Sequence, residues 1–140
     1  MPNTQAVGVA YSDPEFTTCY ASQEIGYSAA AQGTVTQATS KSTGVTLNKS
    51  AGRITMNNAA LAGGVAVSFT LTNSLISAND TIIVNVSGKA TGGPALADPL
   101  AYTAYVATMT AGSAVIVLRN LSATSQSEDV ILNYAIIHGA

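Results

Sequence analysis

Charged side chains are scarce in this chain. Asp, Glu, Lys and Arg make up only 9% of its 140 residues, whereas about 25% is usual in globular domains. The 5 basic and 7 acidic residues leave a net charge of −2, so no clustered basic face is available to bind the phosphates of a nucleic acid. The surface must therefore consist mainly of Ser, Thr, Asn, Gln, Ala and Gly, which suits stable assembly better than a free monomer.

Residues that commonly carry catalysis or bind cofactors are almost absent. The single cysteine, Cys19, forms no internal disulfide, and neither a base nor a cation stands beside it to activate the thiol. The single histidine, His138, lies near the C-terminus, where we expect a frayed side chain. Glu128 and Asp129 are adjacent, so on a strand they point to opposite faces and cannot form an acid/base pair. We expect no enzyme activity and no cofactor, although a calcium ion shared on a symmetry axis stays open as an alternative.

Long apolar runs are missing as well. Gly and polar residues interrupt the aliphatic stretches, which fall far short of the ~20 residues that a membrane-spanning helix needs. The N-terminus lacks the basic start and the apolar core of a signal peptide. We therefore expect no membrane partner and synthesis in a cytoplasm.

The sequence does contain a series of short strand patterns. The clearest covers 65–72, where apolar residues fall at every second position: Val65, Val67, Phe69 and Leu71. Residues 81–86 follow the same period of two, and the Asn, Ser and Asp residues in the segment between favour a turn. We expect these two strands to pair antiparallel, each with one face in the core.

Further strand candidates recur along the rest of the chain. They lie at 34–38, 45–47, 53–56, 101–109, 114–120 and 130–137. Turn residues separate the strands at intervals of roughly 8–12 residues, which predicts an all-β fold, a single antiparallel, jelly-roll-like β-sandwich over 33–140. The best helix candidate, 57–61, would be one turn, and the longest loop is 87–99. Nearly continuous apolar residues at 115–118 and 130–137 predict strands buried on both faces, with one face against a neighbouring subunit.

Residues 1–32 read differently, as an extended N-terminal arm. They hold half of the aromatic residues but show no sustained period. They are also acidic, with Glu24 among their carboxylates and no Lys or Arg before Lys41. Two interpretations stay open: the arm contacts a neighbouring subunit or a larger shell, or it supplies an edge strand to its own domain. The residues expected to make subunit or capsid contacts are Tyr11, Asp13, Glu15, Phe16, Tyr20 and Tyr27.

Lys41, Lys49 and Arg53 form the only cluster of positive residues in the sequence. One interpretation is a solvated hairpin. The other is that these residues pair with the acidic residues of an adjacent subunit's arm, where exposed ion pairs would add geometry more than free energy. Both interpretations place the three side chains at the surface.

Three strings resemble a module found in virion proteins of tailed bacteriophages. They are GTVTQATSKSTGVTLNKSAGRITMNN (33–58), VSFTLTN (67–73) and LRNLSATSQSEDVILNYAII (118–137). The module occurs in small trimeric capsid decoration (cement) or head-fibre subunits and in domains of tail fibres. The resemblance covers 33–137 and leaves out the arm. It matches a structural module and no active-site signature, so it implies assembly more strongly than any ligand.

The resemblance implies a homotrimeric decoration protein that binds the major capsid protein on the outside of the assembled shell and is located in the virion. The alternative is a tail-fibre or spike subunit that binds a host surface glycan. Sugars stack on aromatic faces, and the chain has no Trp and no aromatic residue in the loop 87–99. An enzyme such as a depolymerase would need a carboxylate pair or an activated nucleophile, and the sequence offers neither.

Overall fold

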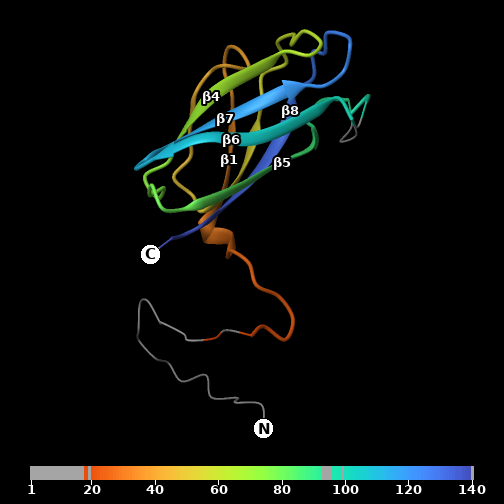
Figure 1. The fold of residues 1–140 in the computed structure, drawn as a ribbon. Coiled ribbons are helices and arrows are strands. Elements are labelled where there is room, and N and C mark those ends of the chain that lie inside the picture. Colours follow the sequence, from red (N-terminus) through yellow and green to blue (C-terminus); the bar gives the residue numbers. More distant parts are fainter. Residues whose placement is uncertain (1–17, 19, 93–95, 99, 140) are drawn as a thin grey trace.

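The computed structural model describes residues 18, 20–92, 96–98 and 100–139, and it is an all-β sandwich (Figure 1). Its strands are β1 (Gln32–Thr36), β2 (Val45–Thr46), β3 (Ala51–Thr55), β4 (Ala66–Thr72), β5 (Thr81–Lys89), β6 (Tyr102–Thr110), β7 (Ser113–Asn120) and β8 (Val130–Ile137). A short 3-10 turn, η1 (Ala29–Ala31), precedes β1. Each strand overlaps one of the predicted strands.

The strands form two four-stranded sheets. Sheet A has the order β1-β3-β8-β5, and sheet B has the order β2-β4-β7-β6. The prediction of a purely antiparallel sandwich is wrong, because β1 pairs with β3 and β2 pairs with β4 in parallel. The first four strands alternate between the sheets, so each returns to its own sheet through a strand of the other. Such a crossover makes neighbouring strands parallel.

The predicted pairing of 65–72 with 81–86 is also wrong. β4 pairs with β7 in sheet B, whereas β5 pairs with β8 in sheet A. The segment between them crosses from one sheet to the other, and the buried Asn73 holds it in place. Its side chain accepts a hydrogen bond from the amide of Leu75 at 3.0 Å and donates one to the carbonyl of Lys49 at 2.8 Å. The predicted alternation of faces is confirmed, since Phe69, Leu71 and Ile82 lie in the core.

The core lies between the two sheets. Its fully buried side chains include Ile54, Leu132 and Ile136 from sheet A and Leu71, Ile116 and Leu118 from sheet B. β7 and β8 occupy inner positions in their sheets. Val117 and Ile131, which point away from the core, are buried as well. Neighbouring strands of the same chain flank them on both sides, so burial on both faces is confirmed at these two positions without a second subunit.

Two smaller predictions need correction. Residues 57–60 form no helix; the chain there is irregular and leads to a bridge between Leu61 and Gln126. The long loop starts later than predicted because β5 continues to Lys89. Two prolines of that loop, Pro94 and Pro99, lie outside the described residues. The described part of the chain contains no helix of the length and apolarity needed to cross a membrane.

Candidate functional site

The arm meets the body of the protein at Tyr27. The Tyr27 hydroxyl donates a hydrogen bond to the carbonyl of Ile136 in β8. Gln32 Nε2 donates to the Tyr27 carbonyl at 2.8 Å, and Lys49 Nζ donates to the carbonyl of Ala30 at 2.7 Å. These three bonds fasten the end of the arm across sheet A.

Before Tyr27 the arm leaves the body, as Figure 1 shows. Tyr20 is 93% exposed and Ile25 is 78% exposed, and Glu24 makes no ion pair with any described residue. Four of the predicted contact residues, Tyr11, Asp13, Glu15 and Phe16, lie outside the described residues. Two large side chains, Tyr20 and Ile25, therefore expose apolar surface to solvent on this segment.

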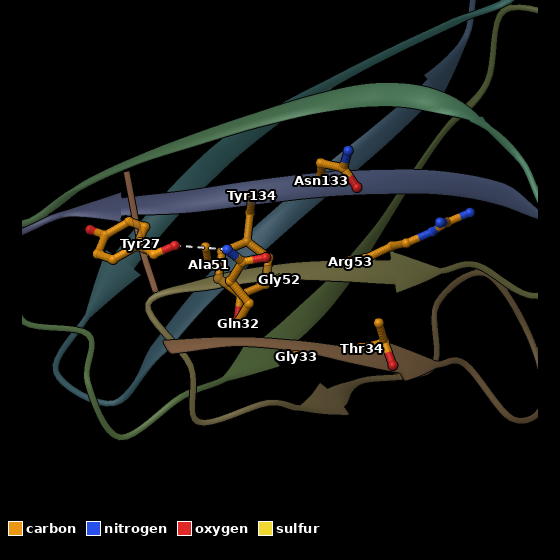
Figure 2. A pocket seen from close by; sticks show the side chains of 9 residues that line it. All are labelled: Tyr27, Gln32, Gly33, Thr34, Ala51, Gly52, Arg53, Asn133 and Tyr134. Atoms are coloured by element: carbon orange, nitrogen blue, oxygen red, sulfur yellow. Dashed lines mark hydrogen bonds between the residues drawn. The ribbon is translucent and has the colours of Figure 1, made fainter. Parts of the chain in front are cut away.

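A hollow of about 580 Å³ opens beside Tyr27 on the outer face of sheet A, the face turned away from the core (Figure 2). It is lined by Tyr27, Gln32, Gly33, Thr34, Ala51, Gly52, Arg53, Asn133 and Tyr134. The strand register places Thr34, Arg53 and Asn133 side by side in one row across β1, β3 and β8. Ala51, in the neighbouring row, adds only a short side chain to the floor of the hollow. Figure 2 shows Tyr27 at one end and Arg53 at the other.

Two glycines under the hollow keep the sheet close to the segment below it. A Cβ on Gly52 would lie 2.5 Å from the ring of Tyr134 and 2.6 Å from Leu47. A Cβ on Gly33 would lie 2.9 Å from both Leu47 and Lys49. These distances are far shorter than ordinary contacts, so the residues beneath β1 and β3 pack against bare backbone.

The hollow carries one positive charge and no negative one. Arg53 is exposed, no acidic residue lines the hollow, and the guanidinium forms no ion pair with another described residue. The hollow was not anticipated from the sequence. The alternation of Thr34, Arg53 and Asn133 with inward residues was readable there, but their alignment depends on strand pairing.

Lys41, Lys49 and Arg53, the three residues of the predicted positive cluster, lie in three different environments. The predicted hairpin is wrong, because β2 and β3, the strands of the segment that contains these residues, lie in different sheets. Lys41 is only 3% exposed, and its ammonium donates hydrogen bonds to the backbone carbonyls of Asn57 and Glu128. Burial lowers its pKa to about 8, against the opposing effect of the Asp129 and Glu128 carboxylates. Lys41 thus acts inside the domain, while Lys49 holds the arm and Arg53 faces the hollow.

Glu128 and Asp129 hold the loop that follows β5. Glu128 Oε1 lies 3.4 Å from Lys89 Nζ and accepts a hydrogen bond from the amide of Ala97 at 2.9 Å. Asp129 accepts bonds from the amides of Ala90 and Thr91, at 3.2 and 3.1 Å. Burial opposes ionisation of Asp129, but a hydrogen bond from the Thr91 hydroxyl, together with those from the two amides, outweighs it and lowers the pKa of Asp129. Both carboxylates are used to fix a loop. The expectation that they point to opposite faces of a strand is wrong, because both residues precede β8 and line the same cavity.

Two buried polar atoms near the loop after β5 lack a hydrogen-bond partner among the described residues. The hydroxyl of Tyr102 and Oε2 of Glu128 are buried and have no hydrogen-bond partner there. Burial raises the pKa of Tyr102 to about 12. The neighbouring cavity of about 240 Å³ is lined by Asn58, Lys89, Thr91, Ser127, Glu128 and Asp129, and polar cavities of such size hold ordered water in proteins.

The prediction that the His138 side chain is frayed is wrong, because the side chain is anchored. Its Nδ1 lies 3.2 Å from Oδ2 of Asp80, a carboxylate that is itself buried. Asp80 also accepts bonds from the amides of Ser77, at 2.8 Å, and Gly139, at 3.0 Å. The Ser77 amide is the main cause that lowers the pKa of Asp80 to about 2. The C-terminus is therefore fixed to the turn before β5.

No group of three or more His, Cys, Asp or Glu residues in the described ranges is arranged to hold a metal ion. A scan against protein-family models, a search of curated proteins and a search of solved structures each find no match to this chain. The argument for a function therefore depends on the arm, the hollow and the sheet faces.

Proposed function

We propose that the chain is a structural virion protein of a tailed bacteriophage, a decoration protein that binds the outside of an assembled capsid. In this proposal three jelly-roll-like sandwiches form a homotrimer, and their arms reach the major capsid protein. The observation that carries it is the arm segment before Tyr27, where Tyr20 is 93% exposed. An aromatic side chain that is almost fully exposed gains most by burial against another molecule.

The composition of the body supports assembly. Its outer strand faces are covered largely by Thr, Ser, Asn and Ala, and only 9% of the whole chain is charged, so subunits pack without strong repulsion. Three of the five described carboxylates, Asp80, Glu128 and Asp129, are already used to fix loops and the C-terminus. The proposed role is therefore structural and not enzymatic.

The proposed mechanism is mass action. A protein that binds only the assembled shell stabilises that shell by RT ln(1 + [L]/Kd), about 2.7 kcal/mol when its free concentration is a hundred times Kd. The arm residues from Tyr11 to Tyr20 would make the shell contact, while Tyr27 holds the arm to the body.

A deletion of residues 1–21 tests this function. The shortened chain keeps Tyr27 and its bonds to β8, so the body should fold normally. We expect light scattering to give three times the chain mass of 14.1 kDa for the intact chain and the corresponding trimer for the deletion. Only the intact chain should sediment with purified capsids of the phage that encodes it. Equal capsid binding by the two chains would overturn the proposal, as would a monomer mass for the intact chain.

A further inference from the structure

We propose that the outer face of sheet A receives Glu24 and Ile25 from the arm of a second copy of this chain. The receiving surface, here called the acceptor face, consists of Ala51, Arg53, Ile83, Asn133, Ala135 and Ile137. This inference rests on the proposed self-assembly and names the contact that would produce it. Residues nearer the N-terminus than Glu24 then remain available for the shell.

The acceptor face has an apolar strip next to a polar row. Ala51, Ala135 and Ile83 align across β3, β8 and β5. Ile83 is 51% exposed and Ile137, which ends β8, is 56% exposed, whereas most of the large aliphatic side chains of the two sheets are buried. Contiguous exposed apolar residues on an outer sheet face commonly mark an interaction surface.

The polar row lies beside this strip. The register aligns Arg53 with Asn133 and Asn85 across the same three strands. Neighbouring rows on one face of a sheet are separated by two residues, roughly 7 Å along the strand. An extended segment that lies between the two rows sends successive side chains to opposite sides. Glu24 can therefore face Arg53 while Ile25 contacts Ala135 and Ile83.

The charges of the two surfaces are complementary. Arg53 has no acidic partner among the described residues, and Glu24 has no basic one. The sequence contains no Lys or Arg before Lys41, so the arm is uniformly acidic. The arm thus carries an acidic side chain that complements Arg53 and an apolar side chain that matches the apolar strip of the acceptor face, which favours a second copy over an unrelated partner.

Tyr27 borders the acceptor face, but residues 20–25 of the protein's own arm do not cover it. Tyr27 is fixed to the carbonyl of Ile136, and from there the arm leads away from the body (Figure 1). Ile25 is only two residues from this attachment and is still 78% exposed. An arm that passes from each subunit to the next forms a head-to-tail contact, which leaves no arm unused when the ring closes. Three copies satisfy this condition.

Cross-linking between two distinguishable chains tests the contact directly. Both chains carry Cys19→Ser; a tagged chain carries Ile25→Cys and an untagged chain carries Ile83→Cys. After mixing and treatment with a short thiol-specific cross-linker, we expect a tagged–untagged dimer on denaturing gels. Thr70→Cys, on the exposed outer face of sheet B, is the matched control and should give at least tenfold less product. Equal products, or no product with Ile83→Cys, would overturn the proposal.

A charge reversal provides a second measurement. Arg53→Glu and Glu24→Lys should each weaken self-association by about tenfold, and the double variant should recover most of the loss, because a close ion pair is restored with reversed sign. Both side chains are exposed, so the urea midpoint of each diluted variant should match that of the wild type. Single variants that keep the wild-type mass at every concentration would contradict the arm contact.

The deletion of residues 1–21 separates this inference from the proposed function. It keeps Glu24 and Ile25, so the trimer should persist while capsid binding is lost. If capsid binding is lost but the charge reversals have no effect, the arm contact is wrong and the decoration role stands. If the charge reversals disrupt the oligomer but the deletion still binds capsids, the arm contact stands and the assigned role of the N-terminal residues is wrong.

Discussion

The body and the arm use apolar residues in opposite ways. In the body, Leu132 and Ile136 are fully buried between two sheets. In the arm, Tyr20 and Ile25 are almost fully exposed. The same kind of side chain therefore stabilises the fold in one region and is available to another molecule in the other. Free energy gained by burial belongs to folding in the body and to association in the arm.

Polar side chains show the same contrast. Asn120 is buried and bonds the carbonyls of Leu61 and Thr124, both within 2.9 Å, and the amide of Ser122. Within the described part of the chain, the side chains of 20–26 make no hydrogen bond at all. Substitutions of buried residues in the body should therefore change the free energy of unfolding, and substitutions in the segment before Tyr27 should change association without changing stability.

The largest effect should come from Leu132→Ala. Leu132 is fully buried in the centre of sheet A, and removal of such a side chain costs about 2–5 kcal/mol of unfolding free energy through lost burial and a cavity. Urea unfolding followed by circular dichroism measures the loss. Val65→Ala, at an exposed apolar position, is the control, with an expected change of about 0.5 kcal/mol or less. Similar losses for the two variants would mean that the core is misplaced.

A smaller loss is expected for Gly52→Ala. The added methyl group would meet the ring of Tyr134 and the side chain of Leu47, and such overpacking costs about 1–3 kcal/mol. Gly26→Ala in the arm is the matched control, because nothing lies within 4 Å of a Cβ added there. Thermal unfolding of both variants checks the expectation. An unchanged midpoint for Gly52→Ala would show that β3 does not lie so close to Tyr134.

Lys41 should make stability depend on pH. Its pKa is lowered to about 8 by burial in the folded protein, against about 10.4 in the unfolded chain. Between these values the unfolded state binds more protons, so the free energy of unfolding contributed by Lys41 rises with pH. From pH 7 to 9.5 the wild type should gain stability relative to Lys41→Met in urea titrations. Parallel pH profiles for the two proteins would rule out a buried ammonium.

The smallest effect on stability should come from Tyr20→Ser. Tyr20 touches little of its own chain, so its replacement should shift the free energy of unfolding by about 0.5 kcal/mol or less. Sedimentation with capsids should nevertheless weaken. A clear loss of stability would mean that the arm belongs to the body, and the contrast between the two regions would fail.

Much of the fold was predictable from local patterns. The alternation of apolar and polar residues in 65–72 predicted the position of β4 and its buried face. The regular spacing of turn residues predicted the positions of the other strands. The partners of those strands were not predictable, because β4 and β5 have compatible patterns and a turn between them. In the structure β4 pairs with β7 and β5 pairs with β8, and the buried Asn73 holds the segment that crosses between the two sheets.

The candidate site was predicted only in part. The aromatic and acidic arm was visible in the composition of 1–32. Lys41 and Arg53 looked alike in sequence, but one is buried against two carbonyls and the other lies on an open sheet face. Burial depends on which segments pack around a residue, so its type and local pattern could not separate them.

The sequence by itself determined where strands form and which side chains face inward, because the period of two is a property of the extended backbone. It also determined the acidic, aromatic character of the arm. The tertiary structure decided the parallel pairs, the row that joins Arg53 to Asn133 and the hollow beside Tyr27. These features depend on register between segments far apart in the chain, which is set when the two sheets pack against each other.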